Sequence, residues 1–192
     1  MYMWTRAVPA VLSALAIAAL SGCSGSGTPT TGDKESGGQM TYRLGEASPP
    51  QKHTMQKYKG GTFTVTPTKV ETGTKADLEA SGLQLDASDV SKIPVYVSAT
   101  LTHKSGKAMA IGDLDDDLVV RTNKDERSRS LVVLMGQAKW PNCPAVDFEK
   151  LLRSGQSESI CSVFLIPEGQ KPATVELTQG FTSAPLEWSV NN

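Results

Sequence analysis

The sequence predicts an all-β protein built as an antiparallel sandwich of about seven strands, with one or two short helical turns. Three observations lead to this prediction. Short runs after residue 58 alternate apolar and polar residues, turn-forming residues separate these runs, and helical periodicity is scarce. The chain of 192 residues is 39% apolar, which is enough for one hydrophobic core.

The expected strands share period-two alternation and turn boundaries. Between residues 93 and 102 the apolar residues Ile93, Val95 and Val97 fall on one face, which is typical of a half-buried strand. Residues 160–166 are apolar on both faces, which predicts a central strand. The expected strands are 62–66, 93–102, 118–121, 131–134, 160–166, 175–177 and 186–190.

Helical signals are confined to two short segments. Residues 77–85 predict a helical turn within a long connection. Residues 147–153 predict a second one, because Gly155 follows as a stop signal. Turns are expected at Lys104–Lys107, Pro167–Gln170 and Gln179–Gly180, where Gly and Pro interrupt the strand pattern.

Four segments together resemble a known family. They are Phe63–Val65, Val95–Leu101 leading into Lys104-Ser105-Gly106, Leu152–Gln156, and Cys161–Pro167. This order is similar to the immunoglobulin-like domain of exported lipoproteins of actinomycetes, and to the secreted immunoprotective antigens of mycobacteria. The resemblance implies an immunoglobulin-like sandwich and an exported setting, and it implies no catalytic activity. The sequence departs from the family pattern at His103 and Lys104, where Asn is usual, and in the long insertion 72–92.

The N-terminus predicts export and lipidation. Arg6 precedes an apolar stretch from Ala7 to Leu20, which is shorter than the roughly 20 residues of a membrane-spanning helix. Leu20-Ser21-Gly22-Cys23 then resembles the lipobox of bacterial lipoproteins, in which the Cys carries the lipid. At least two acyl chains on Cys23 would anchor the protein durably to the lipid bilayer.

The expected organisation therefore has three parts. Residues 1–22 form a lipoprotein signal peptide, residues 23–57 a flexible tether, and residues 58–192 the sandwich domain. The tether is predicted from its Ser, Gly, Thr and Pro content, which offers little to bury. Its length either sets the reach of the domain from the membrane or is an untuned spacer. The mature protein is expected at the outer face of the cytoplasmic membrane.

Two cysteines remain if Cys23 carries lipid. In an exported protein, Cys143 and Cys161 predict a structural disulfide that fastens a loop to the sheet. A zinc site is disfavoured, because the sequence has no C-x-x-C motif and no His near these positions. A redox-active pair is disfavoured by the same spacing.

Acidic and histidine residues provide two candidate metal sites. Asp113, Asp115, Asp116 and Asp117 lie within five positions and offer a calcium site, although their spacing does not match an EF-hand loop. The alternative is a solvated loop balanced by nearby basic residues. His53 and His103 are candidate copper ligands, with Met55 or Met109 as soft partners. An exposed turn is the alternative for His103, and no cofactor is predicted.

A partner-binding site is expected at one hairpin and the loop beside it. Arg121, Arg127 and Arg129 surround a charged tip, and Trp140 places an aromatic ring in a following loop. Loops on a rigid sandwich commonly bind partners. The alternative for Trp140 is that it caps the core beside the disulfide.

Composition and motifs exclude several functions. The net charge of −1 gives no reason to expect nucleic-acid binding. No catalytic serine motif or phosphate-binding glycine loop is present, so we predict that the protein is not an enzyme. The sequence predicts a lipid-anchored binding or interaction module of the cell envelope, whose protein, polymer or small-molecule partner is not identified. The alternatives are a structural spacer without a ligand and a calcium-dependent module.

Overall fold

The computed structural model describes residues 41–53, 59–112, 117–131, 138–178 and 184–190. Internal contacts divide the chain into Met1–Ser36 and Gly37–Asn192, and every described residue belongs to the second unit. The predicted signal peptide, the lipidation site Cys23 and the first part of the tether lie outside the described residues. In the part of the chain that the structure covers, no helix is long and apolar enough to cross a membrane.

The described chain folds into two main sheets, with one short helix and a small third sheet. The elements are β1 (Thr41–Arg43), β2 (Gln51–Lys52), β3 (Thr62–Thr72), α1 (Lys75–Ala80), β4 (Lys92–Ser105), β5 (Met109–Ala110), β6 (Leu118–Thr122), β7 (Arg127–Arg129), β8 (Leu151–Leu152), β9 (Ser157–Pro167), β10 (Pro172–Leu177) and β11 (Leu186–Ser189). The sheets have the strand orders β1-β11-β10-β6-β7, β2-β3-β4-β9 and β5-β8.

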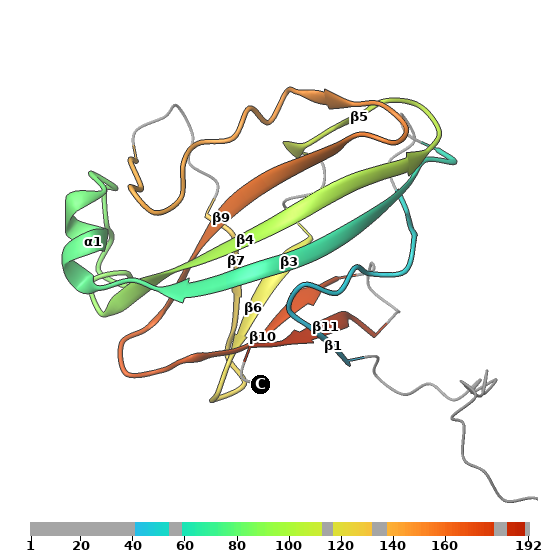
Figure 1. Ribbon diagram of the computed structural model, residues 1–192. Helices are drawn as coiled ribbons and strands as arrows, with labels where there is room; N and C mark the ends of the chain where they lie inside the picture. The colour runs from blue at the N-terminus through green and yellow to red at the C-terminus, as the bar shows by residue number, and fades with distance from the viewer. Residues whose placement is uncertain (1–40, 54–58, 113–116, 132–137, 179–183, 191–192) are drawn as a thin grey trace, which may run out of the picture. The chain divides into compact units, whose positions relative to one another are not determined.

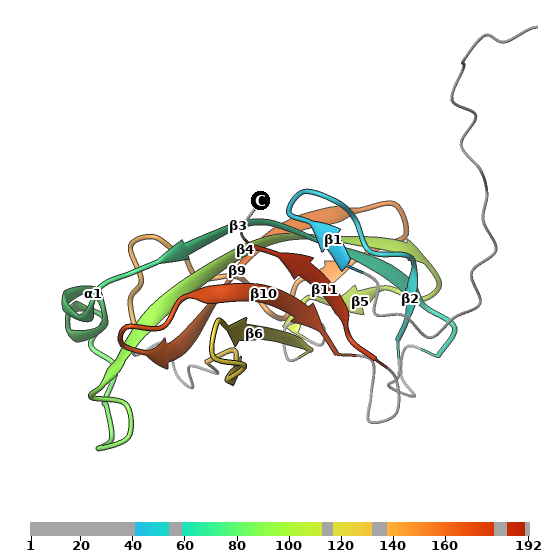
Figure 2. The same ribbon diagram turned by 90° about the horizontal axis from the view of Figure 1, so that it is seen from below.

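The two main sheets pack face to face as an all-β sandwich, as predicted. Figure 1 shows β3, β4 and β9 as long neighbouring strands, and Figure 2 shows β10, β11 and β6 as a second layer beneath them. The main core lies between the layers, because each strand turns its apolar positions inward. It includes Val97 and Leu101 of β4, Phe164 of β9, Val120 of β6 and Trp188 of β11.

The segment from residue 41 to 53 closes one edge of the sandwich, so the predicted tether ends earlier than residue 57. β1 pairs in parallel with β11, and β2 pairs with the start of β3. Between them, Ser48 donates its backbone N–H to the Val65 carbonyl, 2.8 Å away. The Trp188 indole donates to the Glu46 carbonyl at 2.9 Å. The polar composition of this segment concealed its role, because its stabilising contacts are mostly backbone hydrogen bonds.

A second apolar cluster covers the outer face of the β3–β4–β9 sheet. It contains Leu78 of α1, Tyr96 of β4, Val163 and Leu165 of β9, Trp140 and Cys143. The helix begins at a capping box, in which Thr74 and Asp77 exchange side-chain and backbone hydrogen bonds. These hydrogen bonds, from the Thr74 backbone first and then from its hydroxyl, lower the pKa of Asp77.

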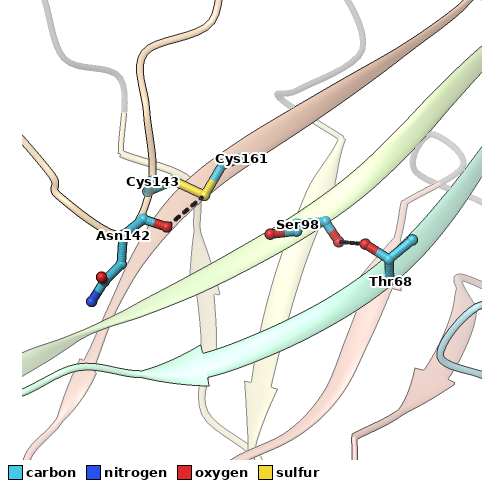
Figure 3. The surroundings of a disulfide bond; sticks show 5 residues. All are labelled: Thr68, Ser98, Asn142, Cys143 and Cys161. Carbon is cyan, nitrogen blue, oxygen red and sulfur yellow. Dashed lines mark hydrogen bonds between the residues drawn. A yellow bond between two sulfur atoms is a disulfide. The ribbon is translucent and has the colours of Figure 1, made fainter.

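The predicted disulfide is present. Cys143 and Cys161 are bonded, with their Cα atoms 5.3 Å apart and a separation of 18 positions in sequence. Figure 3 shows the bond joining the loop at Asn142 to strand β9. A loop of this size implies roughly 3 kcal/mol of stabilisation in the chain-entropy account. The disulfide therefore fixes the loop that carries Trp140 against the sheet.

The predicted helix at 147–153 is wrong. The segment forms a turn and strand β8 instead, because its backbone is taken up by the segment around β5. Gly112 donates its backbone N–H to the Phe148 carbonyl at 2.9 Å, and Ile111 donates to the Lys150 carbonyl at 3.1 Å. A side chain at Gly112 would meet the Phe148 Cβ at 2.9 Å, so this close approach requires glycine.

Two other predicted elements shift. The strand expected at 131–134 lies largely outside the described residues, and the strand found nearby is β7, within the expected hairpin tip. The helix expected at 77–85 occupies residues 75–80 instead. Strand β3 continues past Pro67 to Thr72, because a bulge between Pro67 and Lys69 accommodates the proline.

We predict that Tyr42→Ala lowers the free energy of unfolding by about 2 kcal/mol, because the Tyr42 ring lies 5.5 Å from the ring of Trp188 and packs against the main core. Urea denaturation measures this change. Lys52→Ala, at an exposed position of the same segment, is the control and should change stability by less than about 0.5 kcal/mol. Equal effects for the two variants would contradict the closing role of residues 41–53.

Candidate binding site

An open hollow lies at one end of the sandwich, between strand β3 and the β9–β10 turn. We call it the end hollow, and its volume is about 520 Å³. This volume is within the range of small-molecule sites. The lining residues are Val70, Thr72, Ile93, Gly169, Gln170, Lys171, Pro172 and Val190. They come from both main sheets, so the hollow exists only once the sandwich has formed.

Hydrogen bonds fix the turn that forms one wall of the end hollow. The Gln170 side chain accepts from the Thr122 hydroxyl at 2.5 Å and donates to Glu126 at 2.7 Å. Asn123 and Lys171 exchange two further bonds, because each backbone N–H finds an oxygen of the other residue. The β6–β7 hairpin tip and the β9–β10 turn are therefore tied together, which presents the wall of the hollow in a fixed arrangement.

The wall is mixed in character. Val70, Ile93, Pro172 and Val190 contribute apolar surface, and among the described lining residues Lys171 alone carries a charge. Such a combination suits a ligand with an apolar body and one negatively charged group. Lys69, which precedes the lining residue Val70, is paired with Glu71 at 2.8 Å.

Arg121 is held against the sheet by ion pairs within the chain, and partner binding at Arg121, Arg127 and Arg129 stays a prediction. Its guanidinium lies on the outer face of β6 and contacts Glu176 at 2.7 Å and Glu187 at 3.0 Å. These two carboxylates face each other across β10 and β11 and are almost fully buried, with Glu176 only 2% exposed. Arg121 is needed there, because two adjacent buried carboxylates repel one another.

The same network includes a second arginine. Arg127 of β7 pairs with the other carboxylate oxygen of Glu176, and Arg121 also reaches Asp125 at 3.0 Å. Burial works against the charged form of Arg121, but the hydrogen bonds to Glu176 and Asp125 and the charge of Glu187 outweigh burial and raise the pKa of Arg121. Arg129 is the exception among the three predicted arginines. It is exposed and forms no ion pair with another described residue.

Trp140 is a core residue, which corrects its prediction as a partner-binding residue. Its side chain is only 9% exposed, and its ring meets that of Tyr96 edge-on at 6.0 Å. The disulfide at Cys143, three positions along the chain, holds this loop on the sheet. Burial and the nearby charge of Asp77 raise the pKa of Tyr96. Trp140 therefore caps the second cluster, as the alternative interpretation proposed.

The candidate metal ligands do not assemble among the described residues. His103 is 1% exposed and occupies an inward position of β4, so it is not the exposed turn residue that the sequence suggested. His53 packs against Phe63 instead, with ring centres 6.0 Å apart. In the described ranges no group of three His, Cys, Asp or Glu side chains is placed to hold a metal ion.

The acidic loop is described only at its end. Asp113, Asp115 and Asp116 lie outside the described residues, as does Met55. The Asp117 carbonyl accepts hydrogen bonds from the backbone N–H of Thr178 at 2.9 Å and from its hydroxyl at 3.1 Å. Asp117 thus joins the start of β6 to the end of β10, and calcium binding at this loop stays a prediction.

Comparison with known proteins supports the architecture. The crystal structure of a secreted protein from Mycobacterium tuberculosis, MPT63, aligns with a TM-score of 0.54 and 14% identity, covering 80% of this chain and 99% of that one. The chain shares the MPT63 fold. An uncharacterised β-sandwich protein from Clostridium difficile aligns with a TM-score of 0.48 and 11% identity, covering 83% of this chain and 99% of that one. No family model and no curated protein sequence matches the chain.

Sequence reasoning did not identify the end hollow. Val70 and Val190 are 120 positions apart, and nothing in either local sequence indicates that they line one site. The one available signal was the turn predicted at Pro167–Gln170, which does form part of the wall. Nor did the sequence show that Glu176 and Glu187 are buried, because Glu alternating with apolar residues predicts an exposed position.

We predict that Arg121→Met lowers the free energy of unfolding by about 3 kcal/mol, because it leaves the buried Glu187 carboxylate without its cation. Thermal and urea denaturation measure the loss. Arg129→Met is the matched control on the neighbouring strand and should change stability by less than about 0.5 kcal/mol. Adding Glu187→Gln to Arg121→Met should recover part of the loss, and no recovery would show that the ion pair is not responsible.

Proposed function

We propose that this protein is a lipid-anchored, extracytoplasmic binding module of the cell envelope that acts without catalysis. The observation that carries the proposal is the end hollow, which opens between two rigidly held sheets and has a volume suited to a small molecule. In a sandwich of this kind, such a hollow between the sheets offers a binding site that requires no conformational change. The ligand we propose is a small amphipathic molecule with a negatively charged group.

The charge and shape of the hollow support this ligand class. Three aliphatic side chains, Val70, Ile93 and Val190, would contact the apolar body, and Lys171 would pair with the anionic group. The turn that carries Lys171 is already fixed by Gln170 and Asn123, so little ordering would be needed on binding.

Three observations support an extracytoplasmic location. The Cys143–Cys161 disulfide is a bond typical of oxidising compartments. The sequence Leu20-Ser21-Gly22-Cys23 after an apolar stretch matches a lipoprotein processing site. The similar protein MPT63 is described as secreted, which fits an exported role for the shared fold.

The ligand proposal is tested with the dye anilinonaphthalene sulfonate, which combines an apolar ring system with one sulfonate. We expect saturable fluorescence enhancement with the full chain, weakened at least about tenfold by Val190→Asp and several-fold by Lys171→Glu. Val90→Ser, at an exposed apolar residue outside the hollow, should leave binding unchanged. Each variant's melting curve must match the parent, because partly unfolded chains also bind this dye. Absent binding, or binding unaffected by both hollow variants, would favour a spacer without a ligand.

The anchor is tested separately with Cys23→Ala. Without the thiol that carries the lipid, the protein should be released into the medium or remain in its precursor form. Cell fractionation and mass spectrometry of the N-terminus distinguish these results from the parent. A Cys23→Ala protein that is still processed and membrane-bound would refute lipidation at this residue, while leaving the binding proposal untouched.

A further inference from the structure

The second half of strand β3 is an open edge of the sandwich. On the side away from β4, the first half is covered, because β2 pairs with Thr62 and Phe63 and Gly45 donates to the Pro67 carbonyl at 2.7 Å. From Thr68 to Thr72, no strand of the described chain pairs with β3 on that side. Five residues therefore present a strand edge on which a further strand can form hydrogen bonds.

Both ends of this open edge are defined by the structure. At one end is Pro67, which has no N–H to donate and whose carbonyl is already occupied by Gly45. At the other end β3 stops at Thr72, and the chain turns through Gly73 and Thr74 into α1. The edge thus extends over Thr68–Thr72 and no further.

The sequence of this edge is a charge palindrome. It reads Thr68-Lys69-Val70-Glu71-Thr72, with Val70 at its centre. When two copies of this segment pair antiparallel about Val70, a residue that precedes Val70 by a given number of positions lies opposite the residue that follows Val70 by the same number in the other copy. Lys69 then faces Glu71 of the other copy and Val70 faces itself, while Thr68 lies in the bulge between Pro67 and Lys69, at the limit of the paired region.

We propose that a second copy of this chain docks on this edge, so that two β3 strands pair antiparallel about a two-fold axis at Val70. The two four-stranded sheets would then join into one continuous sheet. Opposite charges directly across two strands are favourable, and like charges are unfavourable. The charge pattern of this edge therefore favours pairing with an identical segment of a second copy. A two-fold interface of this kind is closed and ends at two molecules.

The positions of the side chains fit this arrangement. Lys69 and Glu71 lie on the outer face of the sheet, opposite Ser98 and Tyr96 of β4, and both are exposed. Val70 lies opposite the buried Val97 and borders the end hollow. The second copy would therefore exchange charge pairs on the outer face and place its own Val70 at the edge of the apolar surface.

The same features disfavour an unrelated strand as the occupant. An added strand must supply a negative charge opposite Lys69 and a positive charge opposite Glu71, separated by one small apolar residue. Most sequences fail this requirement and would bury or confront an unmatched charge. Five paired residues bury less than a standard stable interface, so the dimer forms at high local concentration, as on a membrane surface.

Cysteine cross-linking of the exported full chain tests the geometry. At a self-opposed position the Cα atoms of Val70→Cys fall within disulfide reach, and we expect a covalent dimer on non-reducing electrophoresis. Val90→Cys is the control, because Val90 is 51% exposed and lies outside the edge. Absent dimer, or equal dimer from both positions, would overturn the proposal.

Charge reversal tests the selectivity, with cross-linking of the anchored full chain in the Val70→Cys background as the readout. Lys69→Glu alone and Glu71→Lys alone each place like charges opposite one another, and should weaken dimerisation at least about tenfold. Mixing these two variants, or combining both changes in one chain, restores opposite charges and should restore the dimer. Lys150→Glu, which breaks an exposed ion pair elsewhere, should have no effect. Dimerisation that persists in the single variants, or is not restored in the mixture, would overturn the proposal.

Discussion

The structure depends on the burial of both faces of strand β4. This strand is paired along most of its length with β3 on one side and with β9 on the other, so its backbone is satisfied within one sheet. Its side chains must then be covered on two faces. Leu101 and Val97 are covered by the second sheet, whereas Tyr96 is covered by Trp140 and by helix α1. The disulfide acts at this second face, where a loop without regular structure must remain in place.

The elements that could be predicted from sequence are those whose signal is local. β4 alternates from Ile93 to Thr102 and β9 is largely apolar from Ile160 to Ile166, and both strands were located correctly. The cysteine pair followed from counting and from the expected compartment. The segment 41–53 was missed because its contacts are backbone hydrogen bonds to distant strands, for which composition carries no signal. The helix at 147–153 failed because the carbonyls of Phe148 and Lys150 bond to Gly112 and Ile111 instead.

The candidate site was less predictable, because side chains acquire their roles from distant neighbours. The local sequence around Arg121 is typical of an exposed hairpin. Glu176 and Glu187, more than 50 positions away, nevertheless hold its side chain on the sheet. Trp140 lies in a loop rich in Pro and Asn, yet the disulfide and Tyr96 place it in a core. In each case the local sequence correctly predicted a hairpin or a loop, and contacts with residues distant in sequence determined what the side chain does. The end hollow extends this point, since its lining combines strands β3 and β4, the β9–β10 turn and Val190, which are far apart in sequence.

Open strand edges are normally protected, and the form of protection limits which partners remain possible. An edge with only lysines repels a second copy of itself and every basic strand. An edge with Lys69 and Glu71 on either side of Val70 repels uniformly charged strands of either sign. It accepts only a strand that places an acidic residue opposite Lys69 and a basic residue opposite Glu71. A second copy of Lys69-Val70-Glu71, running antiparallel, provides these two residues in the required positions. The exposed Lys69–Glu71 pair contributes little to the stability of one molecule, because solvent screens it. Its larger physical consequence is therefore the restriction it imposes on what can extend the sheet.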